Sequence, residues 1–311
     1  MDRFPDEIIE HYDREIDEGQ RITRGLRQLE LLRTREIVRR HLPPARRRVL
    51  DVGGGTGVHA AWLAADGHDV HLIDRVPRHV DQARRLAPGP GHITAAVGDA
   101  RDLPAAPASF DTVLLLGPLY HLTERAGRVR ALREAARVVR PGGVVVAAAI
   151  SRFASLFDGL AREFLFDPAF RPIVERDLRE GQHRNPDHRP HWFTTAFFHH
   201  PEELRAEVAG AGLELLELVG VEGLAGFLPQ LDRRWQDPSD RELILWAARM
   251  VEAEPSLLGL SGHLLARGVD PFVTLELVTA WDARRNRPPL GADEVAQVVR
   301  SIARRELERW Q

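Results

Sequence analysis

Apolar residues follow two different periods along the chain, and the change falls near residue 45. Before that point they recur every three or four positions, as Leu26, Leu29 and Ile37 illustrate. This spacing predicts amphipathic helices over residues 5–42, which a proline pair at 43–44 would end. Beyond that point short apolar runs alternate with helical patterns, which indicates a sheet covered by helices.

Five apolar runs between residues 49 and 150 are predicted strands. They are 49–52, 70–73, 93–97, 110–116 and 144–150, and helical patterns over 58–66, 77–87 and 124–139 lie between them. The run 110–116 is nearly all apolar, as expected of a strand that is covered on both faces. Alternation at this spacing is typical of right-handed βαβ units, so we predict an α/β fold with a parallel sheet.

The alternation stops after the fifth predicted strand. Helical pieces and a polar stretch fill residues 151–192, an insertion that we expect to cap the carboxyl edge of the sheet, where α/β folds bind ligands. A helix over 201–211 and a sixth strand over 213–219 follow, and residues 224–260 are predicted to be largely helical. Residues 269–311 carry two further amphipathic segments, which predict a helical C-terminal tail.

Composition narrows the chemistry that is open to the chain. There is no cysteine, which excludes disulfides and thiolate metal sites. All 43 basic residues are arginine, so Schiff-base chemistry on lysine is excluded as well. The formal net charge of -3 gives no general case for nucleic acid or an anionic membrane as partner. No apolar run approaches the ~20 residues of a membrane span and the N-terminus lacks the order of a signal peptide, so we expect a cytoplasmic protein.

The stretch 49–57 joins a predicted strand to a glycine-rich loop. Gly53, Gly55 and Gly57 would let a ligand touch the backbone, and the N-terminus of the helix that follows would favour a bound nucleotide. A dinucleotide fingerprint would need a small residue where Val58 stands, so the loop argues against NAD or FAD. A plain tight turn is the alternative for this loop taken alone.

Acidic residues close the next two predicted strands. Asp74 lies about 20 residues after the glycines, where a carboxylate can accept hydrogen bonds from both ribose hydroxyls. Asp99 ends the third strand, where it could accept a hydrogen bond from the exocyclic amine of a nucleotide base. Each acid alone could be an ordinary strand-end residue. With the glycine loop, however, they indicate a nucleotide site at one edge of the sheet.

These motifs resemble those of class I S-adenosylmethionine (SAM)-dependent methyltransferases. The resemblance extends over residues 8–268 and includes the stretches 49–57, 98–100, 110–122 and 137–143 together with Asp74. It implies a Rossmann-like, mostly parallel sheet of seven strands with a reversed final hairpin, and SAM as cofactor. The methyltransferase domain would be 1–268, with a helical lid over 1–45 and the cap described above.

The resemblance also implies which residues meet the cofactor. Gly53, Gly55 and Gly57 would approach the methionine part of SAM, Asp74 would hold the ribose, Asp99 and Ala100 would contact adenine, and Leu116 and Gly117 would lie near the amino group. Asp51 and Arg75 are assigned to the same site. Tyr12 and Arg33 belong to the N-terminal helices, which in similar proteins fold over the cofactor. Arg33 would then meet the SAM carboxylate.

Candidates for the acceptor side follow the fourth predicted strand. Tyr120 and His121 would lie beside the reactive methyl group, and His121 is our first candidate for a general base or substrate orienter. A structural hydrogen bond is the alternative for His121. Phe157, Phe197 and His199 are assigned to the acceptor pocket, with core packing as their alternative. No tight ligand spacing such as His-Glu-x-x-His occurs, so no metal is expected.

The tail carries a second resemblance, to the helical C-terminal module of phage- and plasmid-type primases. It covers about 45 residues, and residues 269–311 hold seven arginines against seven acidic residues, so no basic stripe is available for phosphates. A helical appendage that packs on the methyltransferase or on another subunit is the alternative. The two resemblances compete over 263–266, which the first makes an edge strand and the second a helix. We predict a strand.

The function predicted from the sequence is methyl transfer from SAM to an oxygen or nitrogen nucleophile of a small-molecule acceptor. One alternative is a SAM- or S-adenosylhomocysteine-binding sensor or scaffold without turnover. Another is a methyltransferase associated with nucleic acid, which only the tail suggests. A homodimer is also considered, and neither a membrane nor nucleic acid is expected as partner.

Overall fold

The computed structural model of the chain describes residues 26–270, except positions 43, 88, 190 and 229. The predicted helices before residue 26, with Tyr12, and the tail beyond residue 270 lie outside these residues. Within them, no helix is both long and apolar enough to cross a membrane.

The main sheet runs in the order β3-β2-β1-β4-β5-β9-β8, and β9 is the one strand there that runs in the direction opposite to the others. Its strands are β1 Arg48–Val52, β2 Asp69–Asp74, β3 His92–Val97, β4 Phe110–Leu115, β5 Val139–Ser151, β8 Glu214–Gly220 and β9 His263–Val269. The predicted α/β class and the reversed final hairpin are confirmed. The predicted count of seven strands is too low, because the described sheet has nine.

The two additional strands are short and extend the sheet at the carboxyl end of β5. They are β6 Gln182–His183 and β7 Ala196–His199. Ile150 of β5 pairs with His263 of β9 on one side and with Phe198 of β7 on the other, so β7 occupies the edge of β5 beyond the end of β4. Residues 196–199, which follow the insertion, thus become part of the sheet.

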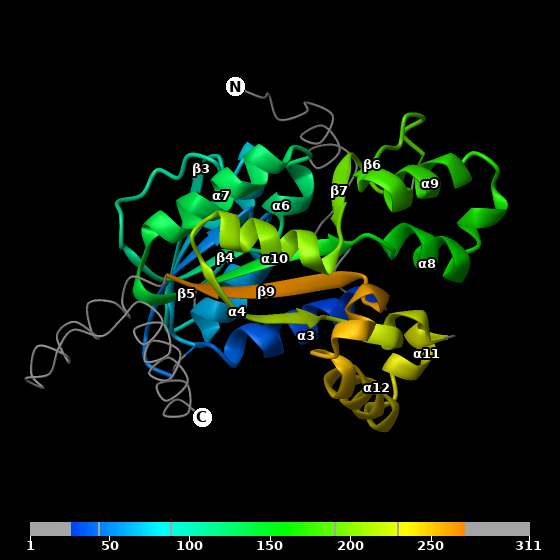
Figure 1. Ribbon diagram of the computed structural model, residues 1–311. Coiled ribbons are helices and arrows are strands. Elements are labelled where there is room, and N and C mark those ends of the chain that lie inside the picture. The colour runs from blue at the N-terminus through cyan, green and yellow to red at the C-terminus, as the bar shows by residue number, and fades with distance from the viewer. Residues whose placement is uncertain (1–25, 43, 88, 190, 229, 271–311) are drawn as a thin grey trace, which may run out of the picture.

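Helices cover both faces of the sheet, as Figure 1 shows. One face packs against α6 Pro118–His121, α7 Arg125–Val138 and α10 Pro201–Gly210. The other packs against α3 Leu26–Arg39, α4 Val58–Ala65 and α5 Pro77–Arg84. Leu114 and Leu115 of β4 are fully buried on opposite faces, which explains why consecutive residues at the end of that strand are apolar.

The insertion after β5 projects from the carboxyl edge of the sheet with α8 Ala154–Ala161 and α9 Arg171–Glu180 (Figure 1). It has a small core of its own, formed by Phe170, Ile173, Val174 and Trp192. The segment between β8 and β9 contains α11 Leu231–Trp235, α12 Pro238–Val251 and 3-10 turns at Gly223–Phe227 and Pro255–Leu260. A further 3-10 turn, Phe164–Phe166, follows α8.

Strand β9 lies between β5 and β8, so the predicted strand at 263–266 is confirmed and the helical alternative is wrong. Leu264 and Leu265 are buried on opposite faces of the sheet. Leucine and alanine favour helices by intrinsic propensity, but burial between two strands overrides that weak preference.

Candidate active site

The glycine-rich loop turns sharply between β1 and α4 and forms one wall of a cavity. Gly53, Gly55 and Gly57 have φ values of 69°, 56° and 90°, in the left-handed region that favours glycine. A Cβ atom at Gly53 would lie 2.8 Å from the ring of Pro118, so this position has no room for a side chain. Gly57 lies outside the cavity wall and packs against Leu86.

This first cavity lies at the carboxyl edge of the sheet and brings together most of the predicted cofactor residues. Its wall includes Gly53, Gly55, Asp74, Arg75, Asp99 and Ala100. Leu116, Gly117, Tyr120 and His121 line it as well. These residues come from four successive strand ends, which the parallel sheet places side by side.

Asp74 joins the end of β2 to the glycine loop. Its Oδ2 atom accepts a hydrogen bond from the backbone N–H of Gly55 at 2.9 Å, and its Oδ1 atom accepts one from Val76 at 2.8 Å. The side chain is mostly buried and borders the cavity. The carboxylate is therefore held in one orientation beside the loop that it supports.

Asp99 is engaged by two arginines. Arg101 donates to it at 2.7 Å, and Arg75 forms a second ion pair with the same oxygen. Burial alone would raise the pKa of Asp99, but the hydrogen bonds and charges of these arginines hold that pKa below its usual value. Asp99 is thus ionised at neutral pH, with its oxygens already occupied by guanidinium groups.

Asp51 lies beneath the loop rather than in the cavity wall. It is fully buried, and neither carboxylate oxygen has a hydrogen-bond partner in the described part of the chain. Burial and then the charge of Asp74 raise the pKa of Asp51 to about 7. A Cβ atom at Gly54 would approach Oδ2 of Asp51 within 2.6 Å, so the backbone of the loop closes directly over this acid.

The raised pKa of Asp51 predicts a stability effect with a definite sign. Between about pH 4, the unfolded pKa, and about pH 7 the folded chain holds a proton that the unfolded chain has lost. The contribution of Asp51 to the free energy of unfolding therefore falls by about 1.4 kcal/mol for each pH unit in that window. We expect Asp51→Asn to gain roughly 2–3 kcal/mol relative to wild type between pH 5 and pH 7 in urea unfolding. If the difference in unfolding free energy between Asp51→Asn and wild type is the same at pH 5 and pH 7, the interpretation of Asp51 as a buried acid with a raised pKa is contradicted.

Tyr120 and His121 lie together on α6, with ring centroids 4.7 Å apart. The Tyr120 hydroxyl donates to the carbonyl of Leu116 at 3.2 Å. His121 is 7% exposed, its Nδ1 atom lies 3.4 Å from the Thr195 carbonyl oxygen, and its ring stacks on Phe193. His121 thus borders the first cavity, and its ring is in contact with Thr195 and Phe193.

The assignment of Arg33 to the cofactor is wrong. Arg33 is fully buried on the side of α3 that faces away from the cavity. Its guanidinium donates to Glu36 at 2.7 Å and to the Val221 carbonyl at 3.2 Å, and it pairs with Glu252. The cavity side of α3 instead carries Arg27, Glu30, Leu31 and Thr34.

A second cavity of about 710 Å³ adjoins the first. Both are lined by Arg27, Glu30 and Tyr120, so the two cavities meet at these residues. Its apolar walls are aromatic, formed by Phe164, Phe170, Trp192, Phe193, Phe198 and Phe227. Three of these rings, Phe164, Phe170 and Trp192, belong to the insertion, which therefore forms part of the wall of this second cavity.

The three residues assigned to the acceptor pocket do not line this cavity. Phe197 and His199 project from the opposite face of β7, because side chains alternate along a strand. The ring centroid of Phe197 lies 3.6 Å from the Arg128 guanidinium carbon, and His199 Nε2 lies 3.2 Å from Glu207 Oε2. Phe198, between them, is the residue that faces the cavity. Phe157 packs behind the wall against Phe227.

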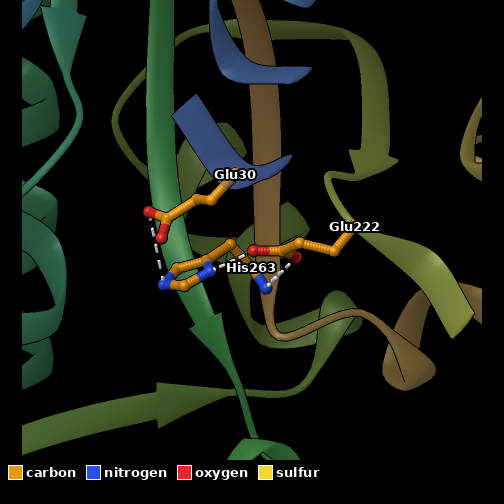
Figure 2. A group of neighbouring side chains, drawn as sticks. All are labelled: Glu30, Glu222 and His263. Atoms are coloured by element: carbon orange, nitrogen blue, oxygen red, sulfur yellow. Dashed lines mark hydrogen bonds and ion pairs between the residues drawn. The ribbon is translucent and has the colours of Figure 1, made fainter. Parts of the chain in front are cut away.

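Sequence reasoning missed Glu30, Glu222 and His263, which meet at the second cavity (Figure 2). Each offers one atom that could bind a metal ion, a carboxylate oxygen or an imidazole nitrogen, and these three atoms lie within 4.8 Å of one another. They come from α3, from the segment after β8 and from the start of β9. No local spacing links positions so far apart, so only the fold could bring them together.

Two family profiles match the chain. The family described as methyltransferase domain matches residues 49–143, and primase C terminal 1 matches residues 257–308. The first part of the primase match coincides with the last 3-10 turn and with β9. Residues 263–269 are therefore shared by a match to a primase module and by the main sheet.

Relatives and a solved structure agree with the first profile. An uncharacterized methyltransferase of Mycobacterium tuberculosis (strain H37Rv) is 40% identical over 102 residues, which cover 33% of this chain and 39% of that protein. A ubiquinone biosynthesis O-methyltransferase of Xanthomonas axonopodis pv. citri is 31% identical over 188 residues, or 60% of this chain and 70% of that protein. A SAM-dependent methyltransferase of Thermotoga maritima shares the fold with a TM-score of 0.51 at 19% identity, covering 84% of this chain and 99% of that chain.

The fold and the site define a nucleotide-binding α/β protein, with a glycine loop and acidic strand ends at one edge of a covered sheet. The similarity to the Xanthomonas protein narrows this class, and the chain belongs to the class I SAM-dependent methyltransferase family. The chain spans about two fifths of the length of the mycobacterial relatives that it matches.

Proposed function

We propose that the protein transfers a methyl group from SAM to an oxygen or nitrogen atom of a small-molecule acceptor. The observation that carries this proposal is the pair of adjoining cavities, one beside the glycine loop and one walled by aromatic rings. When bound, SAM would supply an electrophilic methyl group on a sulfonium sulfur. The chain would supply alignment and a pocket that excludes water.

The residues of the first cavity fit such a cofactor. Gly53 and Gly55 leave the backbone open to a ligand, and Asp74 presents a fixed carboxylate at the end of β2. Asp51 lies beneath the loop, and its carboxylate has no hydrogen-bond partner among the described residues. This buried acid can interact electrostatically with a positive charge bound nearby. Arg75 and Asp99 would position the base end of the cofactor as an ion pair.

Support for a small acceptor comes from the second cavity and from the names of relatives. The cavity volume is within the range of sites that enclose a drug-sized molecule. The Xanthomonas relative is named for O-methyl transfer in ubiquinone biosynthesis, which favours an oxygen acceptor with a ring. Residence in the cytoplasm and a homodimer stay predictions.

One assay separates this function from a sensor without turnover. Protein would be incubated with SAM labelled in the methyl group and with panels of hydroxylated aromatic compounds and of amines. We expect labelled product and S-adenosylhomocysteine with at least one panel. Tight S-adenosylhomocysteine binding without any transfer would favour the sensor.

The match of the tail to a primase module favours one second candidate, a role beside nucleic acid. The balanced charge of residues 269–311 speaks against it. A gel shift with DNA or RNA that weakens as salt rises would favour this role, and no shift at low salt would remove it.

Asp74→Ala tests the cofactor site directly. The variant should lose about 1.5 kcal/mol or more of S-adenosylhomocysteine binding, the scale of a hydrogen bond to a charged group. Isothermal titration calorimetry would measure the loss as roughly tenfold weaker affinity. Asp81→Ala, on the exposed side of α5, is the matched control and should bind as wild type does. Wild-type affinity in Asp74→Ala would refute the assignment.

A further inference from the structure

A buried glutamate holds a histidine at the wall of the second cavity. Oε1 of Glu222, which is 2% exposed, lies 2.5 Å from Nδ1 of His263. The other Glu222 oxygen accepts hydrogen bonds from Ser261 Oγ at 2.8 Å and from the backbone N–H of His263 at 3.0 Å. Ser261 Oγ itself accepts the backbone N–H groups of Glu222 and Gly223. This network fixes the carboxylate, and the carboxylate fixes the imidazole.

These contacts also determine which imidazole nitrogen carries the proton of the neutral ring. Burial alone would raise the pKa of Glu222, but His263 and Ser261 hold that pKa below its usual value. An ionised carboxylate can only accept hydrogen bonds, so Nδ1 of His263 must be the donor. Nε2 is therefore the nitrogen that can gain or release a proton.

The Nε2 atom of His263 points toward the junction of the two cavities. It lies 3.7 Å from Oε1 of Glu30. Figure 2 shows this contact as a dashed line, and Glu30 lines both cavities. The His263 side chain is 27% exposed, so a ligand in the second cavity can reach it. His121, by contrast, contributes to the wall of the first cavity alone.

We propose that His263 is the catalytic residue that takes a proton from the methyl acceptor, that Glu222 is its positioning residue, and that the acceptor is a hydroxyl compound with an aromatic body. This inference rests on the proposed function. It moves the general base from His121 on α6 to a residue on β9.

The chemistry explains why such a pair indicates a hydroxyl group. A neutral amine can attack before it loses a proton, whereas a hydroxyl oxygen becomes a good nucleophile only as its proton leaves. As the oxygen bonds to the methyl carbon, the carbon–sulfur bond breaks, the sulfur keeps the electron pair, and the hydroxyl proton passes to Nε2. The resulting imidazolium lies between the carboxylates of Glu222 and Glu30, which stabilise its charge.

The remaining wall of the cavity fits an aromatic compound with a second polar group. Seven Phe, Trp and Tyr rings line it, Tyr120 included, and the hydroxyl of Ser155 is buried without a hydrogen-bond partner in the part of the chain that the structure describes. Two acidic groups near this wall, Asp158 and Asp167, are paired with Arg162 and Arg189. A second histidine–carboxylate pair, His183 with Asp177, is also present at this wall, but the Nε2 atom of His183 is engaged by the Phe193 carbonyl at 3.2 Å. The Nε2 atom of His263 instead lies beside Glu30, which lines both cavities.

Imidazole nitrogen NMR tests the geometry without any acceptor. In ¹⁵N-histidine-labelled full-length protein we expect His263 to carry its proton on Nδ1 at high pH, and Glu222→Gln to mix the two tautomers. His41 is an internal reference, because its Nε2 atom, rather than Nδ1, lies 2.9 Å from Glu217. A proton on Nε2 of wild-type His263 would overturn the proposal. So would selective broadening of His263 by equimolar Mn²⁺, which would make the group a cation site.

Turnover tests the role. With labelled SAM and the hydroxylated aromatic panel, we expect His263→Asn to lower kcat at least ~100-fold and Glu222→Gln at least ~10-fold, with S-adenosylhomocysteine affinity within about twofold of wild type. Added imidazole should partly restore His263→Ala, which a structural role would not allow. His41→Asn, in a histidine–glutamate pair outside both cavities, should keep the wild-type rate.

The outcomes separate this inference from the proposed function. Transfer to hydroxyl compounds at an unchanged rate in His263→Asn overturns the inference and leaves the function standing. Transfer to amines but not to hydroxyl compounds also overturns the inference and leaves the function standing. No transfer to either panel overturns both.

Discussion

Replacing Arg128 with alanine is expected to destabilise the protein by about 3–5 kcal/mol, the cost of leaving a buried partner uncompensated. Arg128 is 2% exposed and donates to both oxygens of Glu207 at 2.7–3.0 Å. It also donates to the carbonyls of Leu122 and Thr123. The truncation would therefore remove the arginine from the buried Glu207 carboxylate and from two carbonyl oxygens of the α6–α7 turn. Among the described residues, only His199 would remain on Glu207, and Gln182 on the Thr123 carbonyl.

The measurement is urea unfolding at neutral pH, followed by far-UV circular dichroism. Arg133→Ala is the matched control, since Arg133 also joins α7 to α10, through the carbonyl of Gly210, but is exposed. The control should lose less than about 1 kcal/mol. Equal losses in the two variants would show that burial of the Arg128–Glu207 pair does not matter.

Replacing Gly53 with alanine is expected to weaken S-adenosylhomocysteine binding roughly 100-fold, or about 2.7 kcal/mol. The left-handed φ of 69° costs a Cβ-bearing residue about 1–2 kcal/mol. The new methyl group would also lie 2.8 Å from the Pro118 ring, so the loop or α6 must move. Either movement changes the wall of the cofactor cavity.

Gly67→Ala separates the two causes. Gly67 has φ of 95°, but nothing lies within 4 Å of its Cβ position, and it is in the turn before β2. This control should lose stability in urea unfolding but keep wild-type affinity in calorimetry. If Gly53→Ala also keeps its affinity, the loop does not form the cofactor site in the way proposed.

The main sheet could be predicted because most of its strands are short runs of apolar residues that are visible in the sequence. Buried parallel strands need continuous apolar residues, and runs such as 110–116 and 144–150 therefore stand out. The short strands β6 and β7 could not be predicted in the same way. Their pairing depends on the free edge of β5 beyond β4, which is a property of the assembled sheet.

The cofactor cavity was also largely predictable, since its residues follow strand ends at regular intervals. Arg33 was misassigned because charge suggested a ligand while the helix phase places it in the interior. Its neighbours Glu30, Leu31 and Thr34 share the cavity side of α3. Phe197 and His199 each lie one residue from Phe198, which lines the cavity. Because side chains alternate along a strand, that difference of one residue places them on the opposite face.

The acceptor cavity was the part that the sequence did not specify. Glu222 and His263 are 41 positions apart and become neighbours only because β8 and β9 pair. Glu30 reaches them from α3, on a third element. Neither residue type nor spacing distinguishes these three side chains from surface polar residues before the chain is folded.

The position of β9 has a consequence for how this gene could be assembled or divided. A boundary drawn at residue 257, where the primase match begins, would cut away the strand that lies between β5 and β8 and would separate β8 from the sheet. A recombination event that exchanged the tail for another module would therefore preserve the catalytic unit only if its junction fell after Val269. Exchange among related genes should leave junctions on that side of the strand, and sequence comparison of tail variants can look for them there.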